Sequence, residues 1–407
     1  MNAPDAFLAL LEAALHERVP KNLPETIDWP EVYALARQHR VGGLLLDTVL
    51  ALEAPPPDAL LGPWQEHAMV TLLQQIQFVD LLHTVLAAFD QANLKVIVIK
   101  GVALKLLYSN PDMRTMSDAD LLVAPETFEE GQALLQAEGF VRNEQDSTDA
   151  VYVCDHPVGL RVELHQRLFD KKQQGFLAKL DEHALFDMAK AERMAVYGGE
   201  AWLYPPTEHA LFMLLHMAKH MIVTGFGLRQ VGDFLLFVER YDARMDWAAF
   251  WQICGTLSLE RFAASLLTLC HVRLGLPEGQ WQRTLPIPMD REAAEFLLLD
   301  LLEAGVFGKS SQERTRSAAV VYRSFDSETN KDSRAGRLRR AVFVRPSELK
   351  PPYLYAKRHP LLLPVAWVHR MLRFLFQKQG RAHLEATEGM RIADERLALL
   401  EKLGMRG

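Results

Sequence analysis

The chain has 407 residues, of which 49% are hydrophobic and 24% are charged, a balance that excludes a disordered or fibrous protein and is typical of a globular one with two or three domains. Its three scattered cysteines exclude a disulfide framework and favour a reducing, cytoplasmic compartment. No basic leader opens the chain and no run of 18 uncharged apolar residues follows, so we expect neither a signal peptide nor a transmembrane helix.

The first 93 residues have the spacing of helices. Residues 5–18 and 29–52 are amphipathic, and a proline run at 55–57 ends this pattern. A long helix is expected from about Pro63 to Ala92. Its apolar positions recur every three or four residues, which is the helical period, and they are Val70, Leu73, Ile76, Val79, Leu82, Val85 and Leu86.

A β-branched run at 96–99 has the composition of a strand and ends at Lys100 and Gly101. A glycine at this point allows a turn that brings the backbone close to a ligand. The turn-rich segment 110–114 follows and ends in Arg114, whose side chain suits the recognition of phosphate.

Asp118 and Asp120 stand two residues apart and lead straight into an apolar run that ends at Val123. In a β-strand, residues at this spacing project from the same face. Two carboxylates this close repel each other unless a cation lies between them. A hard divalent ion, Mg²⁺ or Mn²⁺, is therefore expected here, and such an ion also binds the phosphates of a nucleotide.

The chain then returns to the sheet in a further acidic strand. Pro125 begins a predicted helix over 125–138, and strands near 140–144 and 150–155 lead into the segment 159–165. Alternation in this segment places three polar side chains on one face, namely Arg161, Glu163 and His165. Glu163 is thus a candidate third carboxylate from a neighbouring strand.

These elements resemble the DNA polymerase beta-like nucleotidyltransferase superfamily, and within it the bacterial family of uncharacterised nucleotidyltransferases. The matching positions are Lys100, Gly101, Arg114, Asp118, Asp120, Leu122, Val123, Glu163, Leu164 and His165. They lie within about 94–168, and weaker similarity extends to about 275. The chain departs from the superfamily in having Val102 where a serine usually follows the glycine, and Glu where Asp is commoner as the third acid.

The resemblance implies a role for each matching polar residue. Asp118, Asp120 and Glu163 would hold the metal and carry the catalysis, while Lys100, Gly101, Arg114, Ser117 and His165 would bind the nucleotide. Simpler interpretations remain open. The Asp-x-Asp pair is often only a polar turn, Lys100 can be an exposed strand end and Arg114 a solvated loop residue. His165 either orients a carboxylate or a water molecule, or merely ends the strand.

The pattern becomes helical again from about Pro205. His209, His216 and His220 follow one another at seven and four residues, so they share a helix face opposite an apolar one. The sequence lacks the His-Glu-x-x-His pattern of zinc hydrolases. The favoured interpretation of this face is a polar contact between helices, and a metal site is the least favoured. In the family that the chain resembles, this helix packs beside the nucleotide cleft, so the resemblance makes His216 and His220 candidates for the cleft wall.

Arg229 and Asp233 lie four residues apart on the next helix. This spacing favours an ion pair between them. In similar proteins an Arg-x-x-x-Asp sequence follows the histidine helix, so the resemblance also makes both residues candidates to border the cleft. Asp246 is expected to cap a helix that begins at Trp247, and further helices are expected at about 258–275 and 291–306.

The C-terminal part of the chain is basic. Residues 309–381 contain 17 Lys and Arg against five acidic residues, a net charge of +12, which leaves −19 for the remainder because the total is −7. This asymmetry indicates an anionic partner or docking onto the acidic remainder. Residues 360–376 are apolar and basic together, so they form either a bundle helix or an interfacial helix on an anionic membrane. A charged helix over about 383–403 ends the chain.

We expect an α+β fold with a small mixed nucleotidyltransferase sheet flanked by helices. The predicted organisation is a helical segment (1–93), a catalytic domain (94–204), a helical bundle (205–308), and a basic linker with C-terminal helices (309–407). The expected reaction transfers a nucleoside monophosphate from an NTP to a small molecule, glycan precursor, peptide or protein. The alternatives are a non-catalytic nucleotide- or partner-binding module, and an enzyme that modifies nucleic acid. We expect a cytoplasmic protein that is either free or peripheral to the membrane.

Overall fold

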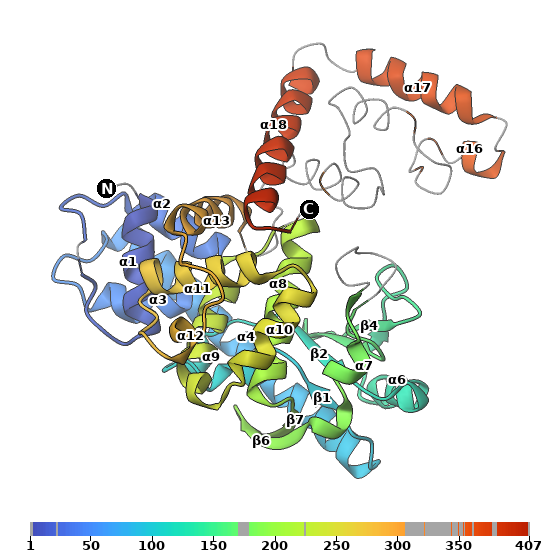
Figure 1. Ribbon diagram of the computed structural model, residues 1–407, viewed down its shortest axis with the longest axis horizontal. Helices are drawn as coiled ribbons and strands as arrows, with labels where there is room; N and C mark the ends of the chain where they lie inside the picture. The colour runs from blue at the N-terminus through green and yellow to red at the C-terminus, as the bar shows by residue number, and fades with distance from the viewer. Residues whose placement is uncertain are drawn as a thin grey trace.

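The computed structural model describes residues 3–21, 23–169, 179–223, 225–305, 355–359, 362–376 and 381–405, together with the single residues 321, 343, 349 and 353. In these ranges helices surround one β-sheet (Figure 1). The α+β class and the mixed sheet predicted from the sequence are confirmed.

The chain begins with four helices. They are α1 (Ala3–Leu15), α2 (Trp29–Gln38), α3 (Gly42–Leu50) and α4 (Asp58–Gln91). The Asp28 carboxylate caps α2 by accepting from the Glu31 N–H. Helix α4 begins before the expected Pro63, which lies inside it.

Seven strands form the sheet in the order β3-β4-β5-β2-β1-β7-β6. Their bounds are β1 (Ile97–Val98), β2 (Asp118–Leu122), β3 (Val141–Arg142), β4 (Val151–Asp155), β5 (Arg161–His165), β6 (Glu192–Val196) and β7 (Gly199–Leu203). At the centre, β2 runs parallel to β5 and antiparallel to β1. The short helices α5 (Val102–Lys105), α6 (Phe128–Ala137) and α7 (Glu182–Leu185) connect strands.

Alternation along the first strand separates two hydrophobic cores. Ile97 and Ile99 belong to the larger core, whereas Val96 and Val98 belong to the smaller one. The smaller core also contains Phe78 and Leu82 of α4 together with Leu135 of α6. The sheet is therefore covered on one face by α4 and α6 and on the other by the helical bundle.

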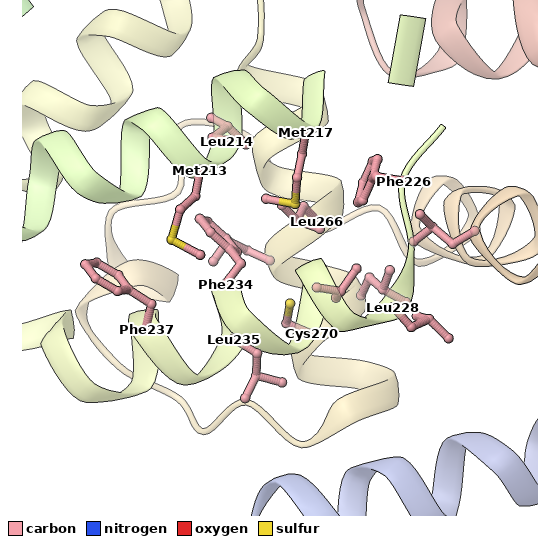
Figure 2. Packing of buried hydrophobic residues seen from close by; sticks show 14 of the residues in the cluster. Met213, Leu214, Met217, Phe226, Leu228, Phe234, Leu235, Phe237, Leu266 and Cys270 are labelled. Carbon is pink, nitrogen blue, oxygen red and sulfur yellow. The ribbon is translucent and has the colours of Figure 1, made fainter. Parts of the chain in front are cut away.

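The bundle consists of six helices. They are α8 (Pro206–Val223), α9 (Leu228–Tyr241), α10 (Trp247–Thr256), α11 (Glu260–Leu274), α12 (Gln280–Arg283) and α13 (Arg291–Ala304). Asp246 caps α10 by accepting from the Ala249 N–H, as predicted. Figure 2 shows the interior of the bundle, where Met213, Met217 and Phe234 meet Leu266 and Cys270.

The N-terminal helices pack into this same core. Phe7 and Leu11 of α1, Val32 of α2 and Leu45 of α3 belong to one hydrophobic cluster with the side chains of α8, α9 and α11. The division of the chain at 93, 204 and 308 stays a prediction, but helices α1, α2 and α3 share a continuous core with the bundle.

The periodic apolar positions of α4 are buried only in the second half of the helix. Val79, Leu82, Val85 and Leu86 are buried, but Val70, Leu73 and Ile76 are 60%, 56% and 41% exposed. The helix predicted from this periodicity is present, but periodicity identifies residues that share a face without showing what covers it. Helix α4 is the one helix in the described part of the chain that is long and apolar enough to cross a membrane, and 39% of that stretch is buried in the fold.

Three helices are described near the C-terminus, namely α16 (Tyr355–Arg358), α17 (Leu363–Phe376) and α18 (Arg381–Lys402). The end of α18 packs on the bundle, where Leu397 and Leu400 join the large core and Arg396 donates to the Met221 carbonyl at 2.8 Å. Most of the basic segment 309–381 lies outside the described residues, and so do the side chains of 370–376.

Candidate active site

The acidic residues of β2 and β5 meet at the centre of the sheet. Asp118 and Asp120 occupy alternate positions of β2, and the parallel register places Asp120 directly beside Glu163 of β5. Alternation within each strand and pairing between the strands thus bring all three carboxylates to one face.

A cavity of about 900 Å³ opens over this face. Eleven of the twelve candidate residues named from the sequence line it, and these are Lys100, Gly101, Arg114, Ser117, Asp118, Asp120, Glu163, His216, His220, Arg229 and Asp233. The twelfth, His165, lies beside Asp120 and Glu163 at the floor. The structure therefore gathers in one place residues that are up to 133 positions apart in the sequence.

Asp120 is the most buried carboxylate of the three, with a side chain 6% exposed. Its Oδ2 lies 2.9 Å from the Lys100 Nζ, and the same ammonium lies 3.2 Å from the Nε2 of His216. Burial alone would raise the pKa of Asp120, but the Lys100 ammonium and the His165 ring outweigh it and lower this pKa. Burial would lower the pKa of Lys100, but the negative charges of Asp120 and Asp118 outweigh it and raise this pKa. Lys100 and Asp120 therefore form an ion pair.

Gly101 turns the chain away from β1 at the edge of the site. Its φ is +68°, a left-handed conformation that a residue with a side chain adopts only with strain. The following residue, Val102, is fully buried in the smaller core and begins α5. The position that usually carries a serine hydroxyl therefore contributes to packing.

A compact group of potential cation ligands overlaps the predicted set at Asp120 and Glu163. Among the described residues, Asp120, Glu163 and His165 form a group whose potential ligand atoms all lie within 4.8 Å of one another. Asp118 is outside this group and accepts a hydrogen bond from the Ser117 hydroxyl at 3.2 Å. The group offers two carboxylates and one imidazole, and the ring nitrogens of this imidazole have no hydrogen-bond partner among the described residues. Oxygen and nitrogen donors of this kind suit a divalent ion.

Asp233 pairs with Arg114 rather than with Arg229. The Arg114 Nε and Nη2 atoms donate to the two carboxylate oxygens at 3.0 and 2.6 Å, and the Tyr108 hydroxyl donates to Oδ1 at 2.8 Å. Arg229 instead donates from Nη1 to the carbonyl and hydroxyl oxygens of Thr115, at 2.8 and 3.0 Å. The expected ion pair between residues four apart is thus wrong, because a distant arginine satisfies both oxygens of Asp233.

A model of the uncharacterised nucleotidyltransferase family matches residues 25–275, more than half of the chain. The chain belongs to this family.

Two solved structures are similar to this family member. One is the solution structure of the antibiotic-resistance factor ANT(2'')-Ia, with 14% identity over 48% of this chain and 98% of that one, and a TM-score of 0.33. The other is an antigenic nucleotidyltransferase-like protein from Paracoccidioides brasiliensis, with 18% identity over 41% and 75% of the two chains and a TM-score of 0.27. A search of the curated proteins found no match.

The histidines of α8 form part of the cavity wall of this nucleotidyltransferase. The rings of His216 and His220 lie 4.4 Å apart, centroid to centroid. Burial, followed by the positive charge of Lys100, lowers the pKa of both, to about 4 for His220. They are therefore neutral at physiological pH. His209, two turns earlier on α8, lines a second, smaller pocket, and its ring centroid lies 4.9 Å from that of Phe237.

Some residues that shape the site carried no signal in the sequence. Gln75 of α4 holds the backbone before β2, since its amide donates to the Met116 carbonyl at 2.9 Å and accepts from the Met116 N–H at 2.7 Å. Gln38, Lys219 and Gln230 also line the cavity. They are polar positions on helices, and only the tertiary fold shows that they face the site.

Proposed function

We propose that this protein is a metal-dependent nucleotidyltransferase that moves a nucleoside monophosphate from an NTP to an acceptor and releases pyrophosphate. The observation that carries this proposal is the register of β2 and β5, which sets Asp118, Asp120 and Glu163 on one face below a cavity that also contains Lys100 and Arg229. Family membership supports the same reaction class.

Asp118, Asp120 and Glu163 are the proposed ligands of Mg²⁺ or Mn²⁺. When bound, the ion would neutralise charge on the triphosphate and polarise the α-phosphate. Lys100 fixes the orientation of Asp120 through its 2.9 Å contact. The short chain of contacts from His216 through Lys100 to Asp120 makes the carboxylate rigid before substrate arrives.

In the proposed transfer step, an acceptor oxygen attacks the α-phosphorus. The new P–O bond forms as the bond between the α-phosphorus and the bridging oxygen breaks, and pyrophosphate leaves with that electron pair. The acceptor proton must go to a base, and Glu163 is the proposed base if it does not complete the metal site. Burial and the neighbouring Asp120 raise the pKa of Glu163, which makes its carboxylate a stronger base than an exposed one.

The phosphates are proposed to lie against Lys100, Gly101, Ser117 and Arg229. The Arg114 guanidinium is engaged by Asp233, so its proposed role is to position the segment before β2. Arg229 donates to Thr115 through Nη1 alone, and its buried Nε has no hydrogen-bond partner among the described residues. A phosphate oxygen would satisfy this group.

Calorimetric titration with each of ATP, GTP, CTP and UTP, with and without Mg²⁺ or Mn²⁺, tests the proposal. Wild type is expected to bind one or more of them in a metal-dependent way, and Asp118→Asn with Asp120→Asn is expected to abolish that dependence. Glu130→Gln removes an exposed carboxylate of α6 and serves as the matched control. Absence of NTP binding by folded wild type would refute the proposal and favour a non-catalytic module, the alternative that Val102 suggests.

A further inference from the structure

The two oxygens of Asp120 have separate partners. Oδ2 lies 2.9 Å from the Lys100 ammonium, whereas Oδ1 faces the Nε2 of His165 at 3.4 Å. Lys100 also contacts His216, which holds the ammonium in place beside Oδ2. A cation can therefore bind Oδ1 while Lys100 stays paired with Oδ2. One oxygen of a fixed, ionised carboxylate is thus directed toward the imidazole.

His165 is buried at this point, and its ring makes only long contacts with the two carboxylates. The residue is 9% exposed, and neither of its ring nitrogens meets the geometry of a hydrogen bond to the described residues. Its Nε2 lies 3.4 Å from Asp120 and 3.7 Å from Glu163, at the edge of both carboxylates. A buried imidazole whose nitrogens make no hydrogen bond is energetically unfavourable. A cation bound jointly by this ring and the two carboxylates would provide the missing interaction.

The strands explain why the imidazole is there. His165 follows Glu163 by two residues on β5, so the two side chains project from one face, and the parallel register sets Glu163 beside Asp120. All three side chains start from rigid, paired backbone rather than from a loop. The donor group is therefore preformed by the sheet.

We propose that His165 is a direct ligand of the divalent ion, together with Asp120 and Glu163, and that this nitrogen makes the site select Mn²⁺ over Mg²⁺. The inference rests on the proposed function and adds a ligand to it. Mg²⁺ prefers an all-oxygen set, whereas first-row transition ions accept imidazole nitrogen readily. Asp118 lies outside this group but lines the same cavity, so it stays a proposed ligand that approaches the ion from the open side.

Pulsed EPR of Mn²⁺ bound to the full-length protein tests the inference, with the metal alone as the probe. The expected spectrum shows modulation from one directly coordinated ¹⁴N nucleus. Growth with ¹⁵N-labelled histidine should convert this signal to that of ¹⁵N, and this measurement needs no variant. In competition, Mg²⁺ should displace Mn²⁺ only at a large excess.

His165→Asn should remove the nitrogen coupling and weaken Mn²⁺ binding by at least about tenfold, narrowing the preference over Mg²⁺. His220→Asn, which removes an imidazole from the wall of the same cavity, should keep the coupling. Bound Mn²⁺ without histidine coupling, or coupling lost in His220→Asn instead, would overturn the inference and leave the proposed function standing. Absence of Mn²⁺ binding both with and without NTP would refute both.

Discussion

Asp233 connects the helical bundle to the loop that precedes β2. Its carboxylate is 4% exposed, accepts from Tyr108, and forms a two-point ion pair with Arg114. Asp233→Asn should lower the free energy of unfolding by about 3–5 kcal/mol, because it leaves a buried guanidinium without a counter-charge. Urea denaturation measures this, and Tyr108→Phe, which removes one hydrogen bond, should cost only about 1 kcal/mol. Equal effects of the two variants would contradict the interpretation.

Arg229 is the arginine expected to bind substrate. Arg229→Gln should weaken NTP binding by about tenfold or more, because a charge-assisted hydrogen bond to phosphate contributes roughly 1.5–3 kcal/mol. Arg240→Gln, at an exposed position of the same helix, is the control and should bind normally. Isothermal titration measures both. Unchanged affinity in Arg229→Gln would remove this residue from the phosphate site.

For single residues, the sequence indicated which side chains lie at the site better than it indicated which side chains they contact. Alternation correctly predicted that Asp118 and Asp120 share a face, because the two-residue period of a strand is a local property. The partner of Asp233 lies 119 residues away, and helical spacing can suggest only a local one, Arg229. The proximity of His165 to Asp120 likewise depends on strand pairing, which alternation within one strand does not specify.

At the scale of a single element, the periodic apolar residues of helix α4 are exposed up to Ile76 and buried from Val79 onward. Leu73 is 56% exposed, whereas Leu82 is fully buried against the sheet. Leu82→Ala should therefore cost about 2–5 kcal/mol of stability, and Leu73→Ala should stay within about 0.5 kcal/mol of wild type. Thermal and urea unfolding of the two variants provide the comparison. A large loss in Leu73→Ala would show that this face of α4 is covered in solution.

The limits of sequence-based prediction at this level have a physical basis. The α+β class and most helices could be predicted because periodicity and caps, such as Asp246 on α10, are encoded locally. The exposure of Val70, Leu73 and Ile76 could not, since an apolar face is buried only if another element reaches it. The order of the seven strands, with β1 between β2 and β7, also depends on long-range pairing.

On the scale of the whole molecule, the buried side chain of His39 connects the N-terminal helices to the bundle. His39, which follows α2, is fully buried, stacks on Phe7 and accepts a hydrogen bond at Nδ1 from the Leu228 N–H at 3.3 Å. Burial lowers its pKa from 6.5 to about 4. At neutral pH the ring is therefore uncharged, so its burial does not remove a charge from water.

This burial predicts a dependence of stability on pH. Between pH 6.5 and 4 the unfolded chain binds a proton at His39 that the folded chain does not, so the free energy of unfolding falls as the pH falls. His39 should contribute a loss of about 2 kcal/mol between pH 8 and pH 5. Urea unfolding at the two pH values should show a smaller loss in His39→Gln, whatever its stability at pH 8. His67→Gln, at an exposed position, should keep the wild-type loss.

The ion pair between Arg114 and Asp233 also bears on how chains of this family diverge. A change at either position alone leaves a buried charge behind, while a joint change to two well-packed apolar residues removes both charges. Substitutions at these positions, 119 apart, should therefore be inherited as a pair. In an alignment of relatives, the two columns should covary although neither side chain is expected to touch the transferred nucleotide.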